Sequence, residues 1–261
     1  MKPKKTKIAV ITVNFNNGSI TEETIRSFAK VDKTGIDLSL IVVDNGSLED
    51  ASKNLAKKLP DVHFIYSKSN LGFAGGNNLG IDFALKNNAE YTLLINNDAT
   101  VEEKSFLVDM LHAKGDIISP LVKYKVDNQL IYDYGGRVDY LFGHNTHFHS
   151  PPSTPPDYYS GVCLFIKAKV FKRVKSLDDG YFLYYEDADF CLRAKEMGFK
   201  LGFCPEASIF HHLSSSTNKL GKKKLIILAN SHLRFCLRHL PLYSLPFYLS
   251  YNLYLRLKTL I

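Results

Sequence analysis

Residues 93–103, "LLINNDATVEE", form an apolar segment that ends in two asparagines and a carboxylate, Asn96, Asn97 and Asp98. Turn chemistry gives one explanation, because Asn and Asp tolerate turn geometry and cap helices. A site for a metal and a phosphorylated ligand gives another. The surrounding sequence has to distinguish the two.

The first half of the chain alternates between strand and helix patterns. Four short apolar runs predict strands, at residues 7–15, 38–44, 62–67 and 91–96. The segments between them predict helices of about a dozen residues, at 19–30, 47–59 and 72–87. This alternation, with strands that are apolar throughout, is typical of an α/β fold whose sheet is mostly parallel and buried on both faces.

Each predicted strand is followed by polar side chains. They are Asn14, then Asp44 and Asn45, then Asn70, and finally the "NND" of residues 96–98. Ligands of open α/β sheets bind beyond the carboxyl ends of the strands. Four polar ends in succession therefore favour a site over four unrelated turns.

The glycine-rich turn "SNLGFAGGNNLG", residues 69–80, opens the third helix and could bring backbone N–H groups to an anion. It is neither a GxGxxG nor a GxxxxGK[ST] motif, which disfavours nicotinamide cofactors and P-loop chemistry. The alternative is a turn whose glycines let the helix pack closely on the sheet.

A second polar cluster, "FLYYEDADF", places Glu186, Asp187 and Asp189 at the start of a predicted helix. Acids are favoured at helix N-termini, and this explains Asp189, which also has Arg193 four residues later. It explains Glu186 and Asp187 less well, because the residues before them are aromatic. Apolar surroundings raise the pKa of a carboxyl, as a general base near neutral pH requires.

A third cluster ends an apolar strand with two histidines, His211 and His212. A histidine on an apolar segment is usually a satisfied core residue. Neutral imidazole is also a common metal ligand, and Asp98 with one of these histidines would suit Mn²⁺. The middle of the chain, 114–159, looks irregular and leads into a Pro-rich loop at 150–161.

These motifs together resemble the family 2 glycosyltransferases, and among them the rhamnosyltransferase-like branch. The resemblance covers about residues 6–240 and rests on "VITVNFNN", "VVDNGSLEDA", "NLGFAGGNNLGIDFAL", "LLINNDATVE", "SGVCLFIKAKVF", "FLYYEDADFCLRAKEMGF" and "SSST", in that order. It implies a GT-A fold, a nucleotide-sugar donor, a divalent metal (Mn²⁺ or Mg²⁺) and inversion at the anomeric carbon.

The resemblance also implies roles for individual residues. Asp187 would be the catalytic base, and Asp98 and His211 would bind the metal. Asn96 stands where the family has the first Asp of its Asp-x-Asp motif, so one charge is missing. The nucleotide-sugar pocket would be lined by Val13, Asn14, Asp44, Asn70, Gly75, Asn78, Asn96, Asn97 and Glu186.

The C-terminal part differs in composition from the rest. The chain has 33 Lys and Arg against 26 Asp and Glu, and no acidic residue follows Glu206. Eight of the basic residues lie at or after Lys219, which leaves 25 basic against 26 acidic residues before it. We therefore divide the chain into a GT-A catalytic domain, 1–218, and a basic, aromatic helical tail, 219–261. Basicity confined to a tail disfavours a nucleic-acid partner.

The tail has two interpretations. Residues 240–255 are uncharged but interrupted by prolines, and they are shorter than a spanning helix requires. Tyrosines flanked by Arg and Lys suit a membrane interface and a lipid-linked acceptor. The other interpretation is a helical pair that packs on the domain or forms a homodimer.

The N-terminus and the four scattered cysteines, which form no CxxC pair, indicate a cytoplasmic protein with reduced thiols. On the membrane interpretation of the tail, the protein would be peripheral on the inner face of the cell membrane. The acceptor would be a glycan or a lipid-linked sugar. Two other functions remain open: a non-catalytic nucleotide-sugar-binding protein and a nucleotidyltransferase of similar fold. The glycine-rich turn has only Lys68 nearby, which disfavours the latter.

Overall fold

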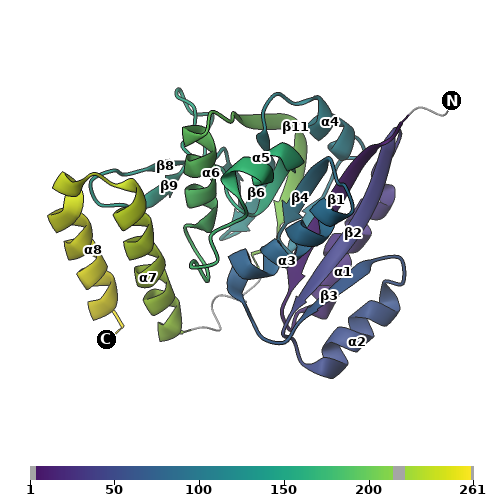
Figure 1. Ribbon diagram of the computed structural model, residues 1–261, viewed down its shortest axis with the longest axis horizontal. Coiled ribbons are helices and arrows are strands. Elements are labelled where there is room, and N and C mark those ends of the chain that lie inside the picture. Colours follow the sequence, from purple (N-terminus) through teal and green to yellow (C-terminus); the bar gives the residue numbers. More distant parts are fainter. Residues whose placement is uncertain (1–3, 214–220, 260–261) are drawn as a thin grey trace.

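The computed structural model describes residues 4–213 and 221–259, and it contains a large central sheet covered by helices on both faces (Figure 1). The strands run in the order β3-β2-β1-β4-β10-β6-β11-β5, and β7 pairs with β6. Their bounds are β1 Thr6–Asn14, β2 Ile36–Asn45, β3 His63–Ser67, β4 Tyr91–Ile95, β5 Ala99–Val101, β6 Ile117–Val126, β7 Gln129–Asp133, β10 Cys163–Lys167 and β11 Leu201–His211. The predicted α/β class is confirmed.

The first four strands are parallel, as the sequence predicts. The chain leaves β1 for β2 and β3 on one side and then returns to β4 on the other side. This change of direction creates a topological switch point beside the carboxyl end of β1, where ligands of such sheets bind. In the second half, β10, β5 and β7 are antiparallel to their neighbours.

The prediction that residues 114–159 are irregular is wrong. These residues contain β6, β7 and a small hairpin of β8 (Gly136–Val138) and β9 (Asn145–His147). Pro120 obscures β6. It pairs with Cys204 at a bulge, after which the register resumes at Ser208, and a bulge is one of the few sheet positions that tolerate proline. The Pro-rich loop prediction holds, since residues 148–157 carry no strand.

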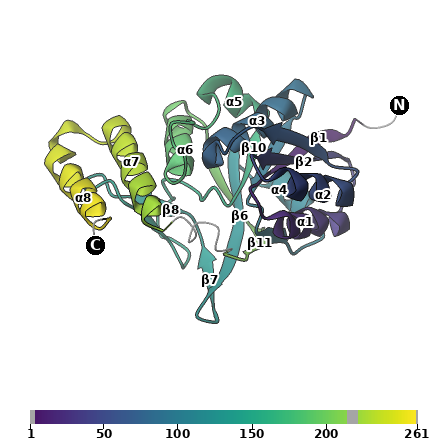
Figure 2. The same ribbon diagram turned by 90° about the horizontal axis from the view of Figure 1, so that it is seen from below.

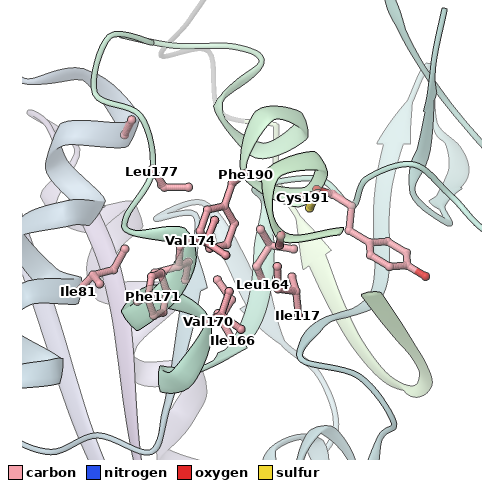
Figure 3. Packing of buried hydrophobic residues seen from close by; sticks show 14 of the residues in the cluster. Ile81, Ile117, Leu164, Ile166, Val170, Phe171, Val174, Leu177, Phe190 and Cys191 are labelled. Atoms are coloured by element: carbon pink, nitrogen blue, oxygen red, sulfur yellow. The ribbon is translucent and has the colours of Figure 1, made fainter. Parts of the chain in front are cut away.

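Alternating residues of the strands face two different layers of helices. Ile11 of β1 packs toward α3, α5 and α6, and its neighbour Val10 packs toward α4. Figure 3 shows the first layer, where Phe171 of α5 and Phe190 of α6 lie over β6 and β10. The helices are α1 Gly18–Ser27, α2 Glu49–Lys58, α3 Gly72–Lys86, α4 Phe106–His112, α5 Ala168–Val174, α6 Glu186–Glu196, α7 Lys222–His239 and α8 Leu245–Leu257.

The tail forms two helices, α7 and α8, that stand beside α6 and the β8–β9 hairpin (Figures 1 and 2). Asp189 of α6 is fully buried and accepts hydrogen bonds from Arg193 Nε at 2.7 Å and from His239 Nε2 of α7 at 2.8 Å. The predicted Asp189–Arg193 pair is therefore confirmed, and it also anchors the tail. The "SSST" motif and the predicted boundary at 218/219 lie outside the described residues.

The outer face of the tail is apolar. Leu242, Tyr243, Phe247, Leu253 and Tyr254 are all exposed there. Within the described part of the chain, no helix combines the length and the apolar character needed to cross a membrane.

Candidate active site

Side chains at the carboxyl ends of β1, β2 and β4 are hydrogen-bonded to one another. The Asn14 amide donates to Asp44 Oδ2 at 2.9 Å, and Thr21 Oγ1 of α1 donates to Asn14 Oδ1 at 2.8 Å. Asn97 Nδ2 donates to the same Thr21 oxygen at 3.0 Å. Asn14, Asp44 and Thr21 are buried, where such networks are stronger than in water and hold their members in place. The structure therefore brings together three of the strand-end residues found in the sequence.

A second set of contacts ties β2 to the glycine-rich turn. Asn45 Nδ2 donates to Asn70 Oδ1 at 3.1 Å and to Gly72 O at 2.9 Å. A Cβ added to Gly76 would lie 2.9 Å from Val13 Cγ1 of β1, and one on Gly80 would lie 3.2 Å from Val43 Cγ2 of β2. These approaches support the interpretation that the glycines let α3 pack closely on the sheet.

Asp98 and His211 meet because β5 pairs with the end of β11, with Ala99 opposite His211. His211 Nε2 lies 3.0 Å from Asp98 Oδ1, and both side chains are largely buried. His212 instead contacts Thr100, through Nε2 at 3.1 Å from Oγ1. The pairing therefore selects His211 over His212 as the neighbour of Asp98.

The Asp98–His211 pair fits a divalent cation. The two side chains present a nitrogen and an oxygen 3.0 Å apart, close enough for one bound ion to share them. Carboxylate oxygen and imidazole nitrogen together suit Mn²⁺. The described residues contain no group of three or more His, Cys, Asp or Glu side chains placed to hold a metal, so the remaining ligands would come from the nucleotide and water.

Glu186 and Asp187 begin α6 directly after Tyr184 and Tyr185, whose φ angles are +73° and +69°. Left-handed backbone is strained for such residues and gathers at functional sites. The N–H groups of Gly161 and Ala188 each donate to an Asp187 oxygen at 2.8 Å. This arrangement fixes the Asp187 carboxylate at the start of the helix.

Burial raises the pKa of both carboxyl groups. For Asp187, the N–H donors of Gly161 and Ala188 oppose the rise. The pKa of Glu186 lies well above its usual value because of burial and the neighbouring charge of Asp187. Glu186 is 5% exposed, and its Oε2 has no hydrogen-bond partner among the described residues. Asp187 is therefore the more easily ionised group of the two, and Glu186 favours its protonated form.

A pocket of about 450 Å³ lies in front of these two carboxyl groups. Asn96 lines it from the end of β4, and its backbone N–H donates to Val162 O at 2.9 Å. Gly161, the residue before Val162, holds Asp187. Residues 161 and 162 therefore connect the "NND" segment to the predicted base.

His147 and Tyr158, which line the pocket, and Asp133 beside them are absent from the sequence predictions. His147 Nδ1 lies 2.8 Å from Asp133 Oδ2, and His147 Nε2 lies 3.2 Å from the Tyr158 hydroxyl. Burial lowers the pKa of His147, but Asp133 outweighs it and the net shift is upward. On the donor side, Thr21 is also absent from the sequence predictions. All of these residues lie in segments without a recognisable motif.

The Asn78 side chain makes its contacts away from this pocket. Its carboxamide exchanges two hydrogen bonds with the backbone of Leu177, at 2.9 and 3.1 Å. The side chain therefore fixes the loop before α6 to α3. The roles assigned to Val13, Asn14, Asp44, Asn70, Gly75, Asn78, Asn96, Asn97 and Glu186 as nucleotide-sugar ligands stay predictions.

Comparison with known proteins agrees with this geometry. Residues 9–173 match glycosyl transferase family 2. The chain is 27% identical over 221 residues to the low-salt glycan biosynthesis hexosyltransferase Agl10 of Haloferax volcanii, covering 78% of this chain and 67% of that protein. It is 22% identical over 241 residues to the N-acetylglucosaminyl-diphospho-decaprenol L-rhamnosyltransferase of Mycobacterium tuberculosis, covering 81% and 78%.

Solved structures show the same fold. The mannosyltransferase PcManGT of Pyrobaculum calidifontis, in complex with GDP-Man and Mn²⁺, superposes with a TM-score of 0.59 at 15% identity, over 98% of this chain and 71% of that one. GalNAc-T7 with UDP, GalNAc and Mn²⁺ gives a TM-score of 0.63 at 15% identity, over 79% of this chain but only 43% of the other.

The α/β sheet with its strand-end site is thus that of a GT-A glycosyltransferase. Within that class, the chain belongs to glycosyl transferase family 2 and is similar to its rhamnosyl- and hexosyltransferases. The predictions of fold, family and glycosyltransferase activity are confirmed.

Proposed function

We propose that the chain is an inverting glycosyltransferase that acts in cell-surface polysaccharide synthesis. It would move a sugar from a nucleotide-diphosphate donor, dTDP-rhamnose or a UDP-hexose, to a hydroxyl of a glycan or lipid-linked acceptor. One observation carries the proposal: residues 161–162 link the "NND" segment to Asp187, so that Asn96 and the held Asp187 carboxylate line one pocket. The names of the similar proteins support the donor and acceptor classes.

The donor side would hold the nucleotide. Asp44 and Asn14 would contact the base and ribose beside the switch point, where the network fixes them. Asp98 and His211 would hold Mn²⁺ or Mg²⁺, which when bound neutralises charge on the departing diphosphate. The Mn²⁺ complexes of similar fold support this assignment.

The acceptor side would supply the proton transfer. The bond between the anomeric carbon and the diphosphate oxygen breaks through an oxocarbenium-like state. The acceptor hydroxyl forms the new bond from the opposite face and gives its proton to Asp187. No covalent enzyme intermediate is formed, so a second ionised carboxylate is not required, which is consistent with a neutral Glu186.

A donor screen tests the proposal. The purified protein would be incubated with Mn²⁺ or Mg²⁺ and a panel of dTDP-, UDP- and GDP-sugars, and free nucleoside diphosphate would be followed by mass spectrometry. We expect slow, metal-dependent hydrolysis of one donor. Absence of hydrolysis across the panel, together with no donor-induced rise in melting temperature, would contradict the proposal.

We also propose that the tail lies on the cytoplasmic face of the membrane as a peripheral contact. The exposed apolar residues of α7 and α8 occur together with Lys and Arg and without acidic residues after Glu206. This combination suits anionic lipid. The alternative partner for the same face is a second copy of the chain.

Two exposed leucines allow a sharp test. Leu242→Asp with Leu253→Asp would lower sedimentation with phosphatidylglycerol vesicles, whereas Leu48→Asp, at an equally exposed site on the far side of the sheet, would not. Unchanged vesicle binding in the double variant would refute the membrane contact. A loss of dimer mass by light scattering, without a change in vesicle binding, would assign the face to self-association.

A further inference from the structure

The wall of the pocket that faces Asp187 is built by parts of the chain outside the family match at residues 9–173, together with the β8–β9 hairpin. His144 and Asn145 come from the hairpin and the turn before it, and Tyr251 comes from α8. The Tyr251 ring lies 5.8 Å from the His144 ring and 5.1 Å from the His232 ring of α7, measured between centroids. The tail therefore contributes a side chain to the wall of the pocket.

Tyr251 is held in position by its neighbours. The next residue, Asn252, is buried and donates through Nδ2 to Ala229 O at 2.6 Å and contacts His232 Nδ1 at 3.2 Å. His232 Nε2 in turn lies 2.8 Å from Phe142 O. A binding site needs side chains whose orientation is fixed by packing and hydrogen bonds, and this chain of contacts fixes Tyr251.

Three polar atoms around the pocket have no hydrogen-bond partner among the described residues. They are His144 Nδ1, Asn145 Oδ1 and Glu186 Oε2, and all three are buried. Buried polar atoms are nearly always paired, so each orphan needs an explanation. Three of them around one pocket, one on a side chain that is only 5% exposed, indicate a ligand with several hydroxyl groups.

The charges and aromatic faces narrow the chemistry of that ligand. The Asp187 carboxylate would repel a phosphate at this position, and the nearby His147 is already paired with Asp133 at 2.8 Å. The aromatic side chains of Phe73 and Tyr251 also line the pocket. Aromatic faces with a few converging polar atoms suit a neutral sugar ring.

We propose that Tyr251, Asn145 and Glu186 form the subsite for a neutral sugar ring of the acceptor, so that the tail helix α8 completes the acceptor site. The inference rests on the proposed function. The acceptor hydroxyl would lose its proton to Asp187 as it bonds to the donor's anomeric carbon, and the nucleoside diphosphate would leave.

The test compares two acceptors of the same donor sugar. Water as acceptor reports donor hydrolysis, and a panel of octyl glycosides of glucose, galactose, mannose and N-acetylglucosamine reports transfer to a neutral sugar. We expect transfer to at least one octyl glycoside. Tyr251→Ala and Asn145→Ala would raise the KM for that glycoside roughly 3- to 10-fold, the size of an aromatic contact or a hydrogen bond, with donor hydrolysis retained.

Tyr243→Ala is the matched control, because it removes the same atoms from an exposed tyrosine of the tail. It would leave the KM unchanged in this vesicle-free assay. Equal KM values for Tyr251→Ala, Asn145→Ala and the unsubstituted protein would overturn the subsite. Donor hydrolysis without transfer to any octyl glycoside would overturn the neutral-sugar assignment and leave the proposed function standing. Absence of donor hydrolysis by the unsubstituted protein would contradict the proposed function itself.

Discussion

The two sides of the active site differ in how their polar groups are satisfied. On the donor side, Asn14, Asp44, Thr21 and Asn97 bond to one another before any ligand arrives. On the acceptor side, buried atoms such as Asn145 Oδ1 and Glu186 Oε2 have no partner among the described residues. The first set is part of the fold's stability and the second set is available to a ligand. The substitutions below should therefore affect stability on one side and turnover on the other.

Asp187→Asn should have the largest effect. Asparagine keeps the shape and one of the two oxygens that accept from the N–H groups of Gly161 and Ala188, but the proton acceptor is lost. We expect turnover to fall by about 10³-fold, within the range for general bases, with nucleotide affinity unchanged by calorimetry. Asp82→Asn, on the exposed surface of α3, is the control. Unchanged turnover in Asp187→Asn would instead favour a different base.

Asp98→Ala and His211→Ala should each weaken Mn²⁺ binding by more than roughly 10-fold, because even the loss of a group that only supports a metal ligand costs 10–100-fold. Each substitution removes one of the two side chains that lie 3.0 Å apart. Titration of Mn²⁺ in the presence of nucleoside diphosphate, followed by electron paramagnetic resonance, measures the affinity. The control is His63→Ala, an exposed histidine at the start of β3, at the amino ends of the parallel strands. Equal affinities would remove the pair from the metal site.

Asn14→Ala and Asn145→Ala test the contrast directly. Truncating Asn14 removes the donor to the buried Asp44 Oδ2 and one of the acceptors of the Thr21 hydroxyl, which should lower the free energy of unfolding by about 2 kcal/mol. Truncating Asn145 removes an atom that already lacks a partner, so a change within about 0.5 kcal/mol is expected. Urea unfolding measures both. Similar losses would show that the two sides are built alike.

The same contrast explains what the sequence could predict. Asn14, Asp44 and Asn97 follow consecutive parallel strands, and the ends of such strands converge, so their proximity follows from the strand pattern alone. His147 and Tyr158 meet only because the β8–β9 hairpin folds back through an isolated bridge between Gly136 and Tyr158. Nothing local to residues 114–159 signals that pairing. Pro120 of β6, which lies opposite the bulge of β11, further hides the strand.

Tyr251 illustrates the same limit at longer range. Its sequence context, apolar and aromatic, predicts a surface or a packing helix equally well. Its place in the pocket depends on Asp189, which links α6 to His239 of α7, and on Asn252, which links α8 to α7. These contacts join residues 50 and 23 positions apart. Such contacts have no period or motif, and only the folded chain reveals them.

Glu186→Gln should have the smallest effect, and it tests the neutral state of the acceptor side. The pKa of Glu186 is raised well above the usual 4.5 by burial. The unfolded chain therefore releases the proton first as pH rises, and the folded protein loses stability from about pH 4.5 upward until its own pKa is passed. Glutamine keeps the shape and carries no such cost.

The difference in melting temperature between Glu186→Gln and the unsubstituted protein should therefore grow in favour of the variant between pH 4.5 and 8, by a few degrees for roughly 1 kcal/mol. Glu196→Gln, whose exposed side chain lies on the same helix, provides the control. A difference that stays constant with pH would mean that Glu186 ionises as easily as a surface carboxyl. The acceptor side would then carry two charges, and the repulsion of a phosphate at this position would be stronger.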